Sequence, residues 1–519
     1  MNRNKKKSVL RFLTTNYIYF VFGFIFSIAV FLRFYNLSNV GIGADQGRDF
    51  FIAWRFIKNL DLISLGPSLS NLPNVYLGPF YYYLLTFWLW IFKFSPFAAN
   101  ILMVIFNLGA LILLFIFSRR LFNQRIAIFV SIFFGLSYWT IFFSRFAWNP
   151  QLVPFFVILT LFSFYQWYDQ NKILYFYLMI MSLIFSLQLH TVCLVLVPIL
   201  IFLYFWFRPK KIFWIHYLIA FLLIFLSFSS LIYFEINNHF IMSQSFKNFF
   251  FSGHGNFFSK IKGNINSYLV YSSALIDGLE IPAKIKKDYL FLWALRINII
   301  ILFFSIGILF LYIYHRKYYF GSVLVLLWFI LSSMMFWFVF RITYFHYLFI
   351  ILPCLFLLLA IFLDFLWGTK ILAGLVLVLF FVFLFLNLRS EFKSMKIINP
   401  YGLKNSIKTV KFLDLQSQGR KYNIWAPAPI YDDAKVYNSA YKGYIEPDLG
   451  LHYLFHLYAE NYDDNNGKNY FIILGPMVKP SAWLKDFPQL RKKTIKLPED
   501  LQKNYTIIKI FNHEIEKFK

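Results

Sequence analysis

Long uncharged segments alternate with short charged gaps along this chain, and this alternation constrains the fold more than any other feature. Ile101–Ser118, Ile126–Phe143 and Ile371–Leu388 carry no charged side chain. Each is about 18 residues long, enough for a helix to cross a hydrocarbon core of roughly 30 Å. Hydrophobic residues make up 60% of the 519 residues, more than soluble domains use. The sequence therefore predicts an all-α polytopic membrane protein.

The net charge of the chain is +27. In a soluble protein this excess would indicate nucleic acid as a partner. Here the basic residues gather at the ends of apolar segments, where they face anionic lipid and set the orientation of the helices. We therefore expect membrane lipid as a partner and no binding to nucleic acid.

Basic residues occur in every second gap, which indicates which gaps face the cytoplasm. Residues 1–16 are basic and are expected to be cytoplasmic. The first span, Tyr17–Phe34, should stay uncleaved because Phe31–Asn36 offers no small-residue cleavage site. Alternating from there predicts about 11 crossings, with the short aromatic segment Pro79–Phe94 lying in the interface instead of crossing.

The membrane domain is predicted over residues 17–390, with a first outer loop at 36–78 and a large outer loop at 235–290. The sequence changes character near residue 390, where charged residues and Pro-Gly turns become frequent. Residues 391–519 are therefore predicted to form a separate domain. An odd number of crossings places it on the extracytoplasmic side of the cell membrane.

Local patterns in residues 391–519 indicate a small α/β domain. Leu403–Leu415 has the apolar periodicity of a helix, whereas Tyr470–Leu474 and Tyr505–Phe511 are rich in the residues that favour strands.

The first outer loop begins Gly41-Ile-Gly-Ala-Asp-Gln-Gly-Arg-Asp49. On a helix, Asp45 and Asp49 would share one side, with Arg48 beside them. For any single acid, a solvated loop would be the more frequent explanation. However, the other predicted outer ends also carry polar and cationic residues: Arg145, Trp148, Asn149, Gln188, His190, Arg341, Tyr344 and His346. A cationic rim with one acidic centre beside lipid suits an anionic lipid head group that reacts at the membrane surface.

Several short motifs follow one another in an order that resembles a known group of enzymes. They are Asp45 and Arg55, Gly78–Leu85 (GPFYYYLL), Arg119–Phe122 (RRLF), Ser144–Gln151, Gln188-Leu-His190, and the stretch from Arg341 to Pro353. Over about residues 15–390 this order resembles the GT-C membrane glycosyltransferases. The nearest groups are bacterial relatives of the protein O-mannosyltransferases, which use dolichyl-phosphate mannose, and the lipid A aminoarabinose transferases.

The resemblance implies transfer of a sugar from a polyprenyl-phosphate carrier to a protein or glycolipid acceptor on the outer face. It maps the first-loop acid of the family onto Asp45. Two positions depart from the family pattern. Gln46 stands where a second acid is frequent, and Gly78-Pro79 stands where the aminoarabinose enzymes have a lysine.

The chemistry of such a transfer assigns roles to these residues. A hydroxyl acceptor is a poor nucleophile, so a carboxylate must take its proton. We expect Asp45 to be this base, with Asp49 in reserve, in a reaction that inverts the anomeric carbon. The lipid phosphate leaves as a stable anion and needs no general acid, unlike the leaving group in glycoside hydrolysis.

Cations should stabilise the charge that grows on the leaving phosphate, and arginine binds phosphate with paired hydrogen bonds. The candidates are Arg341, Arg145 and Arg48, with His346 and His190 as helpers. Arginines at span ends also reach toward lipid head groups without any catalytic function. Expected contacts to the sugar or acceptor are Gln46, Trp148, Asn149 and Tyr81. The aromatic residues among these also fit a simple interfacial belt.

No metal or other cofactor is expected besides the lipid-linked donor. Asp45 and Asp49 could bind a divalent metal through oxygen, but no third acid is near them in the sequence. A lipid or glycan transporter or flippase is the main competing hypothesis, although the acids avoid the centres of the spans, where transporters place them. A ligase that transfers a whole oligosaccharide and a non-catalytic scaffold also fit the sequence.

Overall fold

A computed structural model describes residues 3–511 except 61, 70–73, 252–256, 283–287, 340–344, 370, 397–401, 426–448, 464–468, 475–493 and 496–505. The chain forms two compact units. The first consists of Met1–Tyr35, Ile63–Tyr83 and Ile101–Lys396, and the second of Asn36–Leu62, Leu84–Asn100 and Ile397–Lys519. The residues after 396 thus share a unit with most of the predicted first outer loop.

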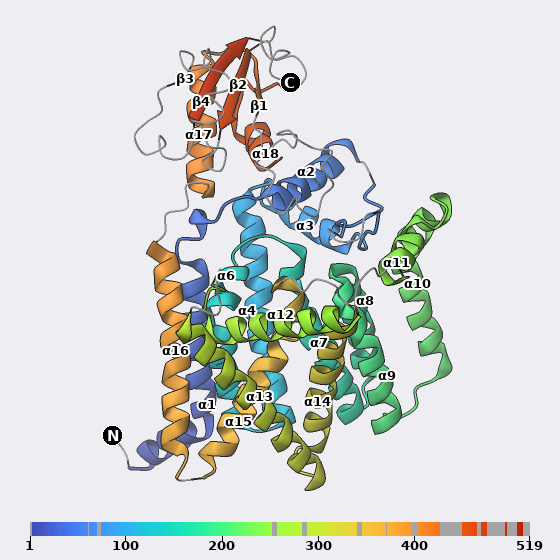
Figure 1. Ribbon diagram of the computed structural model, residues 1–519, viewed down its shortest axis with the longest axis vertical. Coiled ribbons are helices and arrows are strands. Elements are labelled where there is room, and N and C mark those ends of the chain that lie inside the picture. The colour runs from blue at the N-terminus through green and yellow to red at the C-terminus, as the bar shows by residue number, and fades with distance from the viewer. Residues whose placement is uncertain are drawn as a thin grey trace. The chain divides into compact units, whose positions relative to one another are not determined.

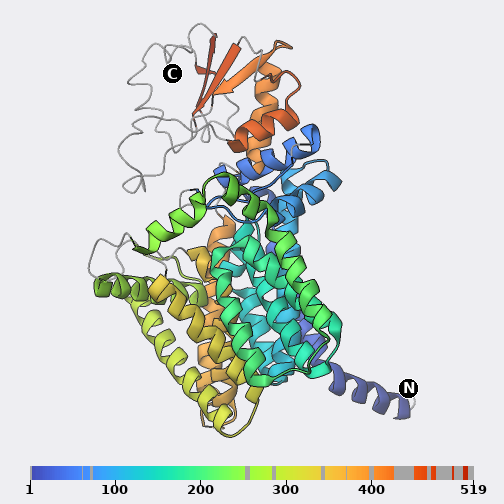
Figure 2. The same ribbon diagram turned by 90° about the vertical axis from the view of Figure 1, so that its right-hand side faces the viewer.

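The first unit is a bundle of apolar helices (Figures 1 and 2). Seven helices in the described part of the chain are long and apolar enough to cross a membrane. The helices are α1 (Arg3–Phe34), α5 (Gln124–Leu136), α6 (Tyr138–Phe143), α7 (Val153–Gln170), α8 (Ile173–Leu189), α9 (Leu196–Phe207), α10 (Trp214–Asn237), α11 (Ile241–Phe251), α12 (Phe257–Asp277), α13 (Tyr289–Tyr314), α14 (Tyr319–Met334), α15 (Leu352–Trp367) and α16 (Ala373–Lys396).

Two further helices, α3 (Phe80–Ile91) and α4 (Pro96–Leu121), each contribute residues to both units. Helix α3 has 12 residues and is about 18 Å long, too short to cross the hydrocarbon core alone. Each predicted crossing segment except Ile126–Phe143 coincides with one helix or with one helix and a short 3₁₀ or π turn. The predicted class, a helical polytopic membrane protein, is confirmed. The number of crossings and their direction stay predictions.

One predicted crossing is interrupted. Ile126–Phe143 was expected to be continuous, but α5 ends at Leu136 and α6 starts at Tyr138, with Ser137 in an extended conformation between them. The hydroxyl of Ser137 donates to the carbonyl of Leu275, and the backbone N–H of Tyr138 donates to Asn387 Oδ1 at 2.9 Å. Long-range hydrogen bonds therefore replace the helical ones that the break removes.

The predicted large outer loop, 235–290, contains helical structure that periodicity did not reveal. Helix α11 begins where Glu235 accepts hydrogen bonds from the backbone N–H groups of Met242 and Ser243. Helix α12 runs across the other helices of the bundle instead of along them (Figures 1 and 2). Tyr268 holds it in place through a hydrogen bond between its hydroxyl and that of Ser333, at 2.8 Å.

A fully buried arginine joins three helices of the bundle. Arg33, near the end of α1, donates to Asn107 Oδ1 at 2.9 Å and to the carbonyl of Gly135 at 2.8 Å. Burying a charged group is costly unless its donors are satisfied. These bonds meet that requirement and link α1 to α4 and α5.

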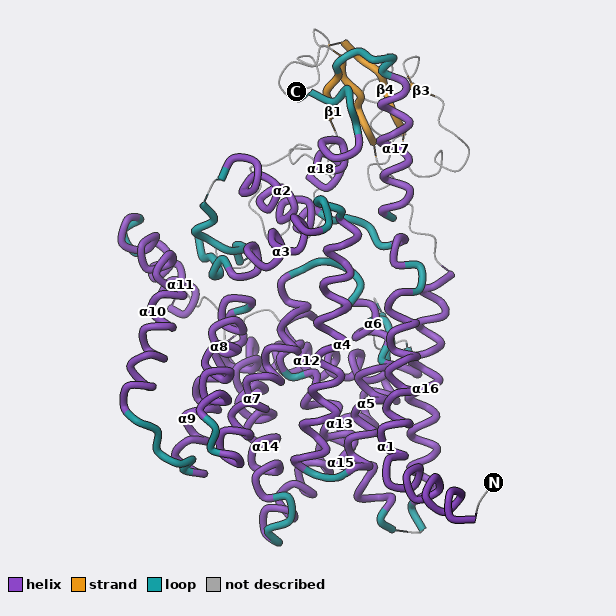
Figure 3. Tube along the Cα trace, turned by 180° about the vertical axis from the view of Figure 1, so that it is seen from behind, coloured by secondary structure: helices purple, strands orange, loops and turns teal. Residues whose placement is uncertain are grey.

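The second unit contains all strands that the structure describes (Figure 3). They form one sheet in the order β1-β2-β4-β3, in which β1 and β2 are parallel and the other pairs are antiparallel. The elements are α2 (Ala44–Asn59), α17 (Leu403–Gln416), β1 (Tyr422–Trp425), α18 (Leu449–Tyr458), β2 (Asn469–Leu474), β3 (Thr494–Ile495) and β4 (Thr506–Phe511).

Alternate residues of the strands form the core of this unit. Tyr422 and Ile424 are two positions apart on β1 and therefore share a face of the sheet. They pack with Phe471, Ile507 and residues of α17 and α18. Helix α17 and strands β2 and β4 lie where a helix and two strands were predicted. Strand β1, strand β3 and helix α18 were not predicted, because their sequences are short or mixed in character.

We predict that Asn387→Leu destabilises the first unit. The side chain of Asn387 is buried, accepts from the Tyr138 N–H and donates to the carbonyls of Ile276 and Phe383. Leucine has a similar volume but leaves two of these backbone groups unpaired, which costs about 1–3 kcal/mol for each buried group. Thermal unfolding in detergent should show a lower midpoint, whereas Phe385→Ala, at an exposed position of the same helix, should change it little. Equal midpoints for Asn387→Leu and wild type would contradict the assignment.

Candidate active site

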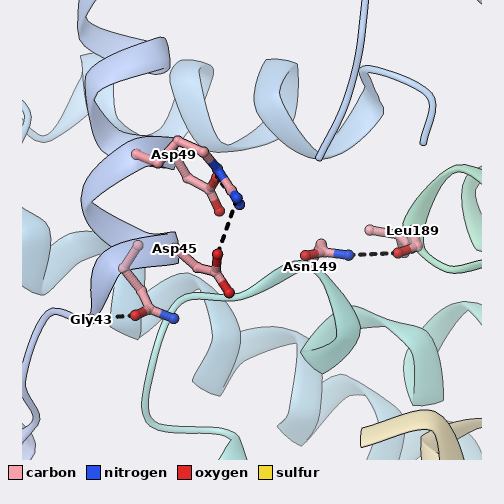
Figure 4. Close-up of polar contacts among 7 residues, drawn as sticks. Gly43, Asp45, Asp49, Asn149 and Leu189 are labelled. Carbon is pink, nitrogen blue, oxygen red and sulfur yellow. Dashed lines mark hydrogen bonds and ion pairs between the residues drawn. The ribbon is translucent and has the colours of Figure 1, made fainter. Parts of the chain in front are cut away.

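Helix α2 presents the acidic residues of the first outer loop. Its N-cap, Gly43, is extended, and the Gly43 N–H donates to Gln46 Oε1 at 2.9 Å (Figure 4). Gln46, expected to touch sugar or acceptor, therefore has a local function as a helix cap. The start of the helix places Asp45 in the first turn, where the helix dipole stabilises a carboxylate.

Arg48 forms ion pairs with both acids of this helix. Its Nη1 lies 3.0 Å from Asp45 Oδ1 and its Nη2 lies 2.8 Å from Asp49 Oδ1. The side chain of Asp45 is 48% exposed, whereas that of Asp49 is fully buried. Only Asp45 can therefore be reached from solvent, and the charge of Arg48 is already balanced by two carboxylates. The ion pair of Asp45 is visible in Figure 4.

In the first unit, three of the predicted site residues lie together. The rings of Trp148 and His346 are in edge contact with centroids 4.5 Å apart, and the His190 and His346 centroids are 5.6 Å apart. Tyr347 lies against both histidines, at 4.8 and 4.6 Å. These residues come from three separate gaps between apolar segments. All three gaps were predicted to lie on the outer side, and that sidedness stays a prediction.

Both histidines are neutral near pH 7. Burial lowers the pKa of His190, and burial together with the neighbouring His190 lowers the pKa of His346. His190 Nδ1 accepts a hydrogen bond from the Val192 N–H at 3.3 Å, so its proton resides on Nε2. The pair can donate neutral N–H groups to a phosphate but does not supply positive charge.

A glutamine and an asparagine fix the backbone beside this histidine cluster. Asn149 Nδ2 donates to the Leu189 carbonyl at 2.7 Å (Figure 4). Gln188 Oε1 accepts from the Phe80 N–H at 3.1 Å, and its Nε2 donates to the Ser227 carbonyl. A Cβ on Gly78 would lie 2.4 Å from Gln188, so a larger residue at this position would displace the Gln188 side chain.

The guanidinium of Arg145 contacts acceptors within the protein. Its Nη2 donates to the Tyr35 carbonyl at 2.5 Å and its Nη1 lies 3.7 Å from Glu391 Oε1. Burial lowers the pKa of Arg145, while the charge of Glu391 opposes this shift. These contacts give Arg145 a structural function, because they join the residue that follows α1 to α16.

Three other predicted residues are less informative. Tyr81 is completely buried, with its ring 5.8 Å from that of Tyr82. Arg341 and Tyr344 lie outside the described residues, and the assignment of Arg341 to the donor phosphate stays a prediction.

The sequence contained signals for some residues of these clusters that were not assigned a role. Gln188 was noted at a span end, and its two hydrogen bonds link the start of α3 to α10. Tyr347 directly follows His346 and looked like the first residue of a span. Glu391 lies at the predicted domain boundary, and no pattern linked it to Arg145, 246 positions away in sequence.

Among the described residues, no group of three or more His, Cys, Asp or Glu side chains is arranged to hold a metal ion. The expectation that the reaction uses no metal stays a prediction.

No family model and no curated protein matches this sequence, but solved structures resemble the fold. ArnT from Cupriavidus metallidurans in the apo state has a TM-score of 0.53 at 11% identity, and the alignment covers 94% of this chain and 97% of ArnT. The fold is GT-C. ArnT bound to undecaprenyl phosphate gives 0.51 at 12% identity, with the same coverage of both chains.

The archaeal oligosaccharyltransferase AglB from Archaeoglobus fulgidus is also similar. In complex with an inhibitory peptide and a dolichol-phosphate, its TM-score is 0.54 at 13% identity, covering 90% of this chain and 70% of AglB. The chain spans only 64% of the Archaeoglobus fulgidus oligosaccharyltransferase in the apo form. Likeness at these identities establishes the GT-C fold that the sequence motifs indicated, and no more.

The buried histidine pair predicts a loss of stability in acid. Because the folded-state pKa lies below the value of about 6.5 in an unfolded chain, the unfolded state binds more protons below that pH. Stability should therefore be complete above about pH 6.5 and fall below it, by up to about 1.4 kcal/mol per pH unit for each histidine.

His346→Phe keeps the aromatic contacts and removes this titration. Unfolding midpoints measured in detergent between about pH 7.5 and pH 5 should fall less steeply for this variant than for wild type. His315→Phe, at an exposed position, serves as the control and should follow wild type. Parallel curves for His346→Phe and wild type would show that His346 is not held neutral.

Proposed function

We propose that this protein is an integral-membrane glycosyltransferase. It transfers a sugar, with inversion, from a polyprenyl-phosphate donor to an acceptor on the extracytoplasmic face. The GT-C fold supports this proposal, since structures with the same fold are described as bound to undecaprenyl phosphate and to dolichol-phosphate. The observation that carries the proposal is that the Asp45 carboxylate is accessible and is held by an ion pair at the start of a helix.

Asp45 acts as the general base. It accepts the proton of an acceptor hydroxyl while that oxygen attacks the anomeric carbon, and the bond from this carbon to the lipid phosphate breaks. The ion pair with Arg48 at 3.0 Å orients the carboxylate and still leaves its second oxygen for the acceptor. Asp49, which is buried and shares Arg48, positions this arginine and is a poorer candidate for the base.

The donor phosphate requires groups that stabilise its charge as it leaves. His190 and His346 are neutral and contribute N–H donors, which are weaker than charged ones. Arg341 is the proposed cationic partner. Its position five residues before His346 in the sequence supports this assignment. Losing one such preorganised donor typically costs on the order of 3 kcal/mol in the transition state.

The acceptor is a protein or a glycolipid hydroxyl. Transfer of a whole oligosaccharide is the second candidate function. It is favoured by the similarity to the archaeal oligosaccharyltransferase, a structure of which is described with a tethered acceptor peptide. An outer location is part of the proposal, because the N-terminal basic residues favour a cytoplasmic start.

We predict that Asp45→Asn reduces sugar transfer by about 10²–10⁴-fold, the usual contribution of a general base, without loss of folding. Purified protein in nanodiscs would receive radiolabelled undecaprenyl-phosphate mannose, glucose or aminoarabinose, with a membrane extract as the source of acceptors. Label transferred from the carrier is then measured. Undiminished transfer by Asp45→Asn would remove this residue from the mechanism.

Glu280→Gln provides a matched control. The Glu280 side chain is 62% exposed and pairs with Lys393 at 3.4 Å, so it is an accessible, ion-paired carboxylate on the other compact unit. It should transfer sugar at the wild-type rate. A comparable loss in both variants would show that the measurement reports general damage to the protein.

A further inference from the structure

Helices α17 and α18 and the four-stranded sheet, here called the C-terminal domain, pack on the helix that carries Asp45. Within the second unit, α18 lies against α2. Tyr453 of α18 is buried, and its ring centroid lies 5.3 Å from that of Phe50 and 5.7 Å from that of Phe51. These two phenylalanines directly follow Asp49 on α2. The acids and the aromatic contacts are thus parts of one short helix.

His456 adds a second contact one turn further along α18. Its ring lies 5.2 Å from that of Trp54 and 5.5 Å from that of Phe51. The ring of Tyr462, which packs against the core of the domain, lies in edge contact with that of His456, with centroids 4.8 Å apart. A series of aromatic contacts therefore runs from the core around the sheet to α2. We call Phe51, Trp54, Tyr453, His456 and Tyr462 the aromatic clamp.

Backbone contacts hold the segment that leads into α2. The Leu403 N–H, at the start of α17, donates to the Val40 carbonyl at 2.9 Å. Gly41 and Gly402 form an antiparallel bridge, and Ile42 packs against the hydrophobic core of the domain. The residues just before Asp45 are therefore attached to the same domain as the residues just after Asp49.

The clamp also reaches the turn between α3 and α4. The hydroxyl of Tyr453 donates to the carbonyl of Phe94 at 2.6 Å. Phe94 and Lys93 both have positive φ, a conformation that is costly for these residues and persists where surrounding contacts maintain it. One buried side chain thus joins α18 to α2 and to this turn.

We propose that the C-terminal domain is a positioning element for the acidic helix, with Tyr453 and His456 as positioning residues. This inference rests on the proposed function of α2 in sugar transfer. A base must be held within a fraction of an ångström of its working position, and a shift of about 1 Å can cost about 10²-fold in rate. Substrate binding elsewhere would be unaffected, so the effect should appear in kcat and not in the donor KM.

The test uses the full-length protein in nanodiscs, with the same radiolabelled undecaprenyl-phosphate sugars as donors. We expect His456→Ala and Tyr453→Ala to lower kcat by about 10- to 100-fold with little change in donor KM. Hydrogen exchange followed by mass spectrometry should be faster in residues 44–59. His456→Phe retains the ring contacts and should restore both the rate and the protection of α2.

Leu415→Ala is the matched control, since Leu415 is on α17 of the same unit and is 77% exposed. It should leave the rate and the exchange of α2 unchanged. Exchange of α2 that stays at the wild-type rate in both alanine variants would overturn the inference. So would kcat losses in them that are no larger than the loss in Leu415→Ala.

Comparison with Asp45→Asn separates this inference from the proposed function. If Asp45→Asn is inactive while the clamp variants are fully active with unchanged exchange, the proposed function stands and the positioning inference fails. If Asp45→Asn remains active while the clamp variants lose kcat and protection, α2 is positioned as inferred and the assignment of Asp45 as the base fails.

Discussion

The exclusion of charge from the hydrocarbon core governs the arrangement of the rest of this protein. The backbone N–H and C=O groups of an apolar helix are hydrogen-bonded within the helix. An ionisable side chain in lipid has no hydrogen-bond partner unless another part of the protein supplies one. Charged residues of the apolar bundle are therefore placed mainly near the ends of the helices or between them. The buried charges of Arg33, Arg145 and Asp364 each have protein partners, which offset the cost of removing them from water.

This constraint also explains how distant residues come together. Asn123 and Arg125, from one predicted inner gap, both contact Asp364 at the end of α15. His346 contacts both Trp148 and His190, and the three residues come from three predicted outer gaps. Residues with the same predicted sidedness thus meet. The parity of the predicted crossings groups these residues but does not reveal which contacts they make.

Local sequence patterns predict the elements of this fold but not the contacts between residues far apart in the chain. Charge-free length identified the apolar helices, and an alternating pattern indicated β2 and β4, because both signals come from a few consecutive residues. The helix break at Ser137 depends on hydrogen bonds from Ser137 and Tyr138 to Leu275 and Asn387, far away in the sequence. No local pattern therefore indicates it. The same holds for the candidate site. Asp45 and Asp49 were predicted to share a helix face, but only packing makes one accessible and the other buried.

The two acids of α2 illustrate how environment separates chemically equal groups. Both carboxylates share Arg48, yet only Asp45 can meet a substrate from solvent. Arg48 and Arg145, selected for their charge, are already paired with acids in the structure. In the proposed mechanism, the positive charge for the donor phosphate would come from fewer residues than the sequence suggested, which places more weight on Arg341.

The central claim is that the acidic helix lies on the extracytoplasmic side of the membrane, and labelling of single cysteines tests it most directly. Cys193 and Cys354 are buried and would be replaced by alanine. Cysteines are then introduced singly at the exposed positions Leu62, after α2, and Lys317, after α13. A membrane-impermeant maleimide should label Leu62→Cys in intact cells and Lys317→Cys only after permeabilisation. Labelling of Lys317→Cys in intact cells, with Leu62→Cys protected, would contradict the account.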